Sequence, residues 1–280
     1  MSTENALLTI LIEKINNDTI TLPTLPEVAV KIRRAADDPD INLTRMADVI
    51  AQDPALSARM MKVANSAFMG RSVKVETINQ AVTRIGLRQI KNIATAMAME
   101  QLFVSKNTLI KSYLTKAWQK TVEISTVAIA LMKLYLKENR HGALNLDTIT
   151  LAALVHNIGV LPILTEAERH EDVFANPQFL GQAIQKLSGR IGSSIMKAWD
   201  FTPDFVEVAE KWSDFNFQYE KAAYVDFVRI GALVTGVLKN IENKEALLQG
   251  YVDKGILPSI DYLESDEFLA QLEEVKAAFA

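Results

Sequence analysis

The residues best suited to chemistry lie at positions 154–159, where the sequence LVHNIG is expected to end a helix before a glycine. His156 can bind a divalent cation through a neutral imidazole. An aspartate after it would add an anionic ligand, as in hydrolytic metal sites, but this chain has Asn157. An amide oxygen brings no charge to hold a cation or to lower the pKa of a metal-bound water. The pair therefore predicts a site that resembles a hydrolase pocket but lacks the anionic ligand needed for catalysis.

The other two histidines do not replace the missing ligand. His141 is expected in a polar turn, and His170 in an exposed, charged stretch. A metal site needs three or four protein ligands that converge from different helices. The chain has no cysteine, which excludes disulfides, thiolate ligands and a cysteine nucleophile. We expect His156 to be a hydrogen-bonded core histidine, with contact to a small ligand as the alternative.

Other catalytic patterns are absent from the sequence. It contains no GxxxxGK[ST] phosphate loop, no GxGxxG after a strand and no GxSxG turn. Ser193 and Ser194 have no evident histidine or acidic partner nearby. The acidic group Glu264, Asp266 and Glu267 is typical of a solvated helix start rather than of an acid–base pair.

The composition indicates a helical protein. Of 280 residues, 49% are hydrophobic and 23% charged, with only 11 glycines and 8 prolines. Leucine, alanine and lysine are frequent, and alternating strand patterns are few, so we expect an all-α fold. The N-terminus lacks a secretion signal pattern, and no apolar run reaches transmembrane length. These features favour a cytoplasmic protein with no membrane partner.

Capping residues predict the N-terminal helices. Asp53 before Pro54 is a strong helix start, and Thr77 can cap a helix that ends before Gly86. The expected helices here are 6–15, 27–36 opened by Pro26, a short helix to Ala51 capped by Thr44, 54 to about 69, 78–85 and 87–103.

The remaining helices are expected to form a second part of the chain. We place a boundary near 105–107, which gives an N-terminal helical subdomain at 1–105 and a second subdomain at 106–280 with an acidic C-terminal extension. The expected helices are 108–139, one capped by Asp147 that ends at His156, one with a Thr165–Glu168 capping box, 179–199 with an interruption near Ser188 and Gly189, 202–212, 219–241 and one or two within 257–280.

Charge is distributed unevenly. Residues 54–99 carry seven basic residues against one acidic residue, and residues 203–280 carry seven basic against fifteen acidic. The two regions could attract each other within the fold, or the basic region could meet an acidic partner. The candidate basic surface consists of Arg59, Lys62, Arg84, Arg88 and Lys91.

Nucleic-acid binding is not the favoured explanation of this charge. The segments 78–85 and 87–103, joined at Gly86, have a helix-turn-helix rhythm. However, the second segment is apolar on all sides at 95–99, which predicts a buried helix rather than one in a DNA groove.

Several separated motifs resemble the HDOD family, whose fold is all-helical and related to the HD metal-dependent phosphohydrolases. The resemblance covers about residues 22–214 and implies an HD-like helical core packed with an N-terminal subdomain, in a bacterial signalling protein. The motifs are LPTLPEV from Leu22, DPALSAR from Asp53, VANSAF from Val63, AVTRIGLRQIKNIA from Ala81, AW at Ala117, LAALVHNIG from Leu151 and IG at Ile191 with Trp199.

The resemblance also implies a ligand set that this chain has lost. The family's histidine and aspartate positions fall on Lys120, His156, Asn157, Ser188 and the neighbourhood of Trp212. Only His156 keeps a ligand side chain, and the ammonium of Lys120 would repel a cation.

We therefore expect a non-catalytic regulatory module without metal or cofactor that contacts signalling or regulatory proteins. One alternative is a nucleotide or anion sensor in which Lys120 contributes charge to the old pocket. Another is a residual metal-dependent phosphohydrolase anchored by His156.

Overall fold

The computed structural model describes residues 3–17, 19–70, 73–139, 142–169, 177–216, 218–237 and 243–279, and these ranges contain helices and no strand. The all-α prediction is confirmed. His141 and His170 lie outside the described residues.

The N-terminal helices begin where local side chains bond the first turn. Asp53 accepts a hydrogen bond from the Leu56 amide at 2.9 Å, and Thr77 forms a capping box with Gln80, so both predicted caps are confirmed. The cap predicted at Thr44 is wrong, because Asn42 accepts from Arg45 at 2.9 Å. The elements are α1 (Thr3–Asn16), α2 (Glu27–Asp37), α3 (Leu43–Ala51), α4 (Pro54–Asn65), η1 (Ala67–Met69), α5 (Ile78–Ile85), α6 (Leu87–Ala98) and η2 (Met99–Leu102).

The helices that follow surround one long central helix, α7. Its N-cap is Asn107, whose side chain accepts from the amides of Leu109 and Ile110. The elements are α7 (Thr108–Glu138), α8 (Leu146–Val155), α9 (Val160–Arg169), α11 (Pro177–Ala198), α12 (Pro203–Lys211), α13 (Tyr224–Val234), α14 (Lys244–Asp253), η3 (Ile260–Glu264) and α15 (Asp266–Phe279).

Four local predictions in this part are wrong, and the first three concern caps and helix length. Asn145, not Asp147, caps α8, because its side chain accepts from the Thr148 amide at 2.8 Å. Residues Thr165 and Glu168 lie inside α9 and cap nothing. The last long helix, expected over 219–241, is the shorter α13.

The helix expected to break near Ser188 runs without interruption as α11. Gly189 is there for close packing, since a Cβ atom on it would lie 2.4 Å from the Glu210 carbonyl oxygen of α12.

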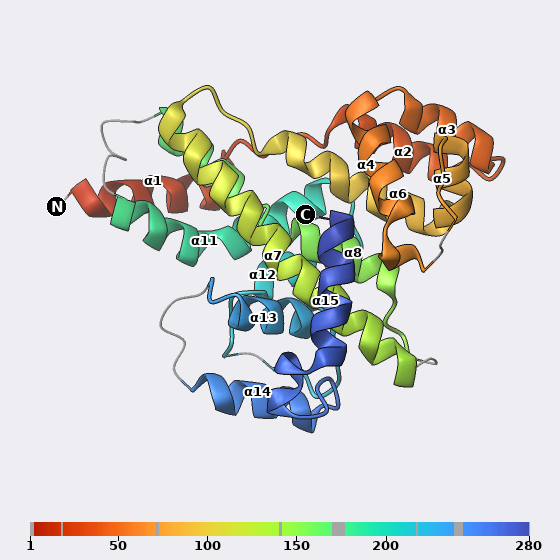
Figure 1. Ribbon diagram of the computed structural model, residues 1–280. Coiled ribbons are helices and arrows are strands. Elements are labelled where there is room, and N and C mark those ends of the chain that lie inside the picture. Colours follow the sequence, from red (N-terminus) through yellow and green to blue (C-terminus); the bar gives the residue numbers. More distant parts are fainter. Residues whose placement is uncertain are drawn as a thin grey trace.

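The helices share one hydrophobic core. In Figure 1, α2–α6 gather on one side, α7 crosses the centre, and α8, α13 and α15 pack against it. Helix α1 lies beside α11, away from the other N-terminal helices. Buried side chains from Leu11 to Phe279 belong to a single cluster. The division at residue 106 stays a prediction.

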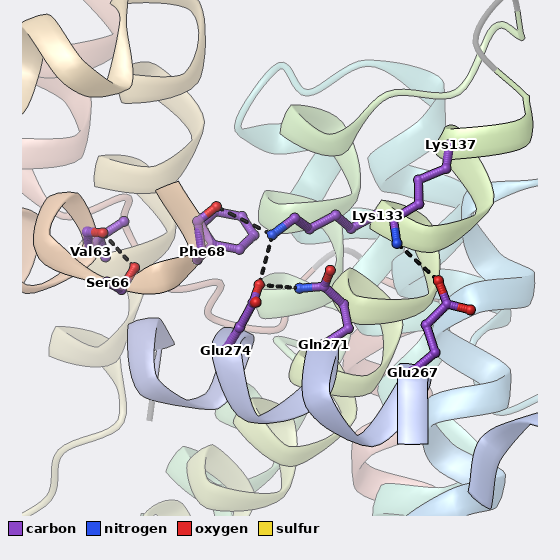
Figure 2. A network of polar contacts seen from close by, with 8 residues as sticks. All are labelled: Val63, Ser66, Phe68, Lys133, Lys137, Glu267, Gln271 and Glu274. Carbon is purple, nitrogen blue, oxygen red and sulfur yellow. Dashed lines mark hydrogen bonds and ion pairs between the residues drawn. The ribbon is translucent and has the colours of Figure 1, made fainter. Parts of the chain in front are cut away.

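Helix α15 connects α7 to the N-terminal helices through polar contacts (Figure 2) and through an aromatic contact. Lys133 on α7 reaches Glu274 on α15 at 3.1 Å and the carbonyl oxygen of Phe68 at 3.4 Å. The ring of Phe68 in η1 meets that of Phe279 edge-on, with centroids 5.3 Å apart. A second ion pair joins Lys137 to Glu267. Helix α15 therefore spans the junction between the two parts.

In the described chain, one stretch, Leu146–Arg169, is long and apolar enough to cross a membrane, but 83% of its apolar window is buried inside the protein. It consists of α8 and α9 with a turn between them, which fits core helices.

Candidate functional site

His156 lies at the C-terminal end of α8 and is almost fully buried, with 1% of its surface exposed. Its Nδ1 lies 2.5 Å from the carbonyl oxygen of Ala153. A carbonyl only accepts, so Nδ1 carries the proton and Nε2 carries the lone pair. Burial lowers the pKa of His156 from 6.5 to about 4, against the opposite effect of the Ala153 bond. The imidazole is therefore neutral near pH 7, as a metal ligand must be.

Trp212 covers this imidazole. It follows α12 directly, is 4% exposed, and meets the His156 ring edge-on with centroids 4.6 Å apart. Within the described residues, His156 Nε2, Trp212 Nε1 and the side-chain oxygen of Asn157 are buried without a hydrogen-bond partner. Three buried polar atoms therefore lack a partner here, and the indole of Trp212 packs directly against the imidazole.

Ser188 lies against the turn that follows His156. A Cβ atom at Gly159 would come within 1.8 Å of the Ser188 carbonyl oxygen, so the turn between α8 and α9 touches the backbone of α11. Only glycine permits this approach. Ser188 is buried, but a hydroxyl is a poor substitute for an imidazole or a carboxylate on a cation.

Lys120 sits apart from this buried group. Its side chain on α7 is 47% exposed, and its ammonium lies 2.5 Å from Glu123 on the same helix. Of the positions predicted for the site, the structure brings His156 and Trp212 into contact and sets Ser188 beside the adjoining turn. Lys120 is held by a neighbour on its own helix.

A buried group of charged residues next to Trp212 was missed by the sequence analysis. The guanidinium of Arg229 on α13 is fully buried, and its Nε donates to the Lys211 carbonyl oxygen at 3.1 Å. On the same helix, Asp226 pairs with Lys254 at 3.1 Å, and burial raises the pKa of Asp226. Two opposite charges in an otherwise apolar helix were the only sequence signal. The charge of Arg229 interacts with the carboxylates of Asp226 and Glu207, so this buried group is internally compensated.

The side chains present do not fit a catalytic metal. Across the residues that the structure describes, no group of three or more histidine, aspartate or glutamate side chains could hold an ion. His156 offers one suitable lone pair, but three or four ligands are needed. No hydrolytic step through a metal can be derived from this site.

The predicted basic surface is divided between two cavities. Arg59 and Lys62 line a cavity of about 660 Å³ between α4, α6, α7 and α15. Arg88 and Lys91 line a separate cleft of about 630 Å³. Arg84 lines neither of these two, and donates to the Ala64 carbonyl oxygen at 3.0 Å.

Part of this positive charge is already paired with acidic side chains of the same protein. Arg59 pairs with Glu100, and Lys91 lies 2.5 Å from Asp37. The end of α6, predicted to be buried, is buried throughout 93–98.

Comparison with known proteins gives a consistent family relationship. Residues 22–215 match the family model described as HDOD domain. A solved structure from Shewanella amazonensis SB2B, provisionally named a metal-dependent phosphohydrolase, is 43% identical, covers 100% of both chains and has a TM-score of 0.95. An HDOD domain protein of unknown function from Geobacter sulfurreducens is 21% identical, with 98% of this chain and 97% of that chain covered and a TM-score of 0.62.

A curated but uncharacterized protein of Treponema pallidum (strain Nichols) is 26% identical over 190 residues. The match covers 64% of this chain and 35% of that protein, so the chain spans about a third of that relative's length.

Proposed function

The chain belongs to the HDOD domain family, and from this premise we propose that it is a regulatory module that acts by binding other proteins rather than by hydrolysis. The observation that carries this proposal is which side chains stand at the positions where the family resemblance places metal ligands. His156 is its one remaining ligand-type side chain, and Trp212 packs against it.

The chemistry of the pocket supports the absence of catalysis. A hydrolytic metal needs several converging ligands and one open position for water or substrate. Asn157 and Ser188 bring no negative charge, and the indole of Trp212 occupies space beside the imidazole.

The proposed partners are signalling or regulatory proteins in a bacterial cytoplasm. The relatives that match this chain come from bacteria. The cavity beside Arg59 and Lys62 combines charged side chains of both signs, including Glu100, with the apolar side chains of Met97 and Trp118, a mixture suited to a protein partner.

The test of this proposal is metal content and thermal stability of the purified protein, with and without chelator. We expect no stoichiometric metal and no change of Tm on adding manganese, magnesium, zinc or iron, since a ligand that binds only the folded state raises Tm. A stoichiometric metal that is lost on chelation contradicts the proposal.

The competing function is the metal-dependent hydrolysis suggested by the name of the Shewanella relative. It is tested by incubating the protein with nucleotides, cyclic dinucleotides and aryl phosphates in the presence of manganese, magnesium, zinc or iron. We expect no turnover above that of a His156→Ala variant. Turnover that needs a divalent metal and disappears in His156→Ala establishes an enzyme.

A further inference from the structure

A second pocket lies at the opposite end of α8 from His156. It is a cleft of about 630 Å³ between α2, α6, the first turn of α8 and the turn from α11 to α12. This volume is within the range of small-molecule sites. The cleft is separate from the candidate site around His156, because none of His156, Ser188 and Trp212 lines it.

One wall of this cleft is a stripe of hydrogen-bond donors on α6. Arg88, Asn92 and Thr95 line it at spacings of one helical turn, so they share a face. Thr95 is 0% exposed, and its hydroxyl has no hydrogen-bond partner within the described part of the chain. A threonine inside a helix usually bonds the carbonyl one turn before it, and an unpaired buried hydroxyl is costly. This hydroxyl is therefore placed for a partner in the cleft.

Helix starts add positive potential to the same cleft. Leu87 of α6, Asn145 before α8 and Thr202 before α12 all line it, so three helices begin there. The N-terminal ends of helices carry partial positive charge that favours anions, and α6, which has no side-chain cap, also offers free amide donors. Thr202 makes no side-chain capping bond to α12.

The cleft also offers a flat surface and an acceptor. The guanidinium of Arg33 lies 4.2 Å from the ring centroid of Phe201 and donates to the carbonyl oxygens of Trp199 and Asp200 at 2.9 and 3.1 Å. Asp147 lines the cleft as a carboxylate that interacts with the charge of Arg88. The cleft thus combines cations, an aromatic ring and an acceptor for hydroxyl groups.

We propose that this cleft binds a small phosphorylated molecule. Its phosphate lies against Arg88, Asn92 and the Thr95 hydroxyl, near the helix starts. Its apolar or flat body rests on Phe201, and its hydroxyl groups donate to Asp147. Such a ligand would contact the N-terminal helices and the core helices at the same time. Its binding would therefore be able to regulate the module. The inference goes beyond the proposed function and holds whether or not the old pocket is catalytic.

Calorimetric titration of the full chain with AMP and with phenyl phosphate tests the site, with adenosine as the uncharged comparison. We expect saturable binding of the phosphorylated probes and at least tenfold weaker binding of adenosine, since charge-assisted bonds are worth about tenfold or more in affinity. Arg88→Gln and Thr95→Val are each expected to weaken the phosphorylated probes about tenfold. Lys111→Gln, which removes an exposed charge from α7 away from the cleft, is expected to bind as the wild type does.

The stability of Thr95→Val separates a ligand contact from a folding defect. Valine has the shape of threonine without the hydroxyl, so the ligand-free variant is expected to keep or raise Tm while it loses affinity. The proposal is overturned if neither phosphorylated probe binds saturably at millimolar concentration, or if Arg88→Gln and Thr95→Val bind as the wild type does. Metal content and hydrolysis are read in separate assays, so failure of this site leaves the proposed function to its own test.

Discussion

The imidazole of His156 is held as a buried core side chain. The ring is neutral, its Nδ1 is bonded to the Ala153 carbonyl oxygen, and the indole of Trp212 packs against it. The consequence can be measured as a dependence of stability on pH, because the ring titrates differently in the folded and unfolded chains.

Folding keeps His156 neutral, with a pKa of about 4 against 6.5 in the unfolded chain. Its contribution to stability is therefore complete above pH 6.5 and is lost as the pH falls towards 4, because only the unfolded chain then gains the proton. The loss at acid pH amounts to about 3 kcal/mol. We expect His156→Gln to remove this loss, as seen by urea unfolding of both proteins at several pH values. An unchanged slope in the variant would show that other groups cause the acid sensitivity.

At the scale of helices, close backbone approach fixes how α8, α9 and α11 meet. Gly159→Ala would place a Cβ atom 1.8 Å from the Ser188 carbonyl oxygen, a contact that only backbone movement relieves. We expect a loss of about 3 kcal/mol or more in the free energy of unfolding. The matched control is Gly181→Ala in α11, where nothing lies within 4 Å of the added atom. That change is expected to stabilise the helix by about 0.5–1 kcal/mol. Equal effects of the two substitutions in urea unfolding would contradict this packing.

Two helix starts were predicted correctly from local information, whereas the caps assigned to Thr44 and Asp147 each belong to an asparagine two residues earlier. Asp53 and Thr77 bond amides within their own first turns, so the sequence alone identified them. Gly189 was mistaken for a helix break because its purpose, the contact with Glu210, involves another helix.

The same distinction applies to the candidate site. His156 was identifiable as a buried histidine, because the apolar end of α8 is a local pattern. Asp226 and Lys254 are far apart in the sequence, so their ion pair could not be predicted from residue spacing.

For the whole molecule, α15 joins the N-terminal helices to the core (Figure 2), beside the more extensive packing of α6 on α8. Its contacts with α7 include the pairs Lys133–Glu274 and Lys137–Glu267, both with substantially exposed side chains. Exposed pairs of this kind contribute little to stability. The buried ring of Phe279, packed on Phe68, is therefore expected to supply most of the attachment.

Phe279→Ala removes this anchor and is expected to cost about 3 kcal/mol. Because the ring packs on η1, amide hydrogen exchange should increase more in α4 and η1 than in α13, which packs on α7. Leu269→Ala on the same helix is the matched control, since Leu269 is 45% exposed and is expected to change little. Exchange that increases equally in α4 and α13 would mean that the chain opens as one unit. A selective increase of amide exchange in α4 would identify α15 as the helix that holds the N-terminal helices against α7. A partner that binds α15 would then be able to weaken this attachment.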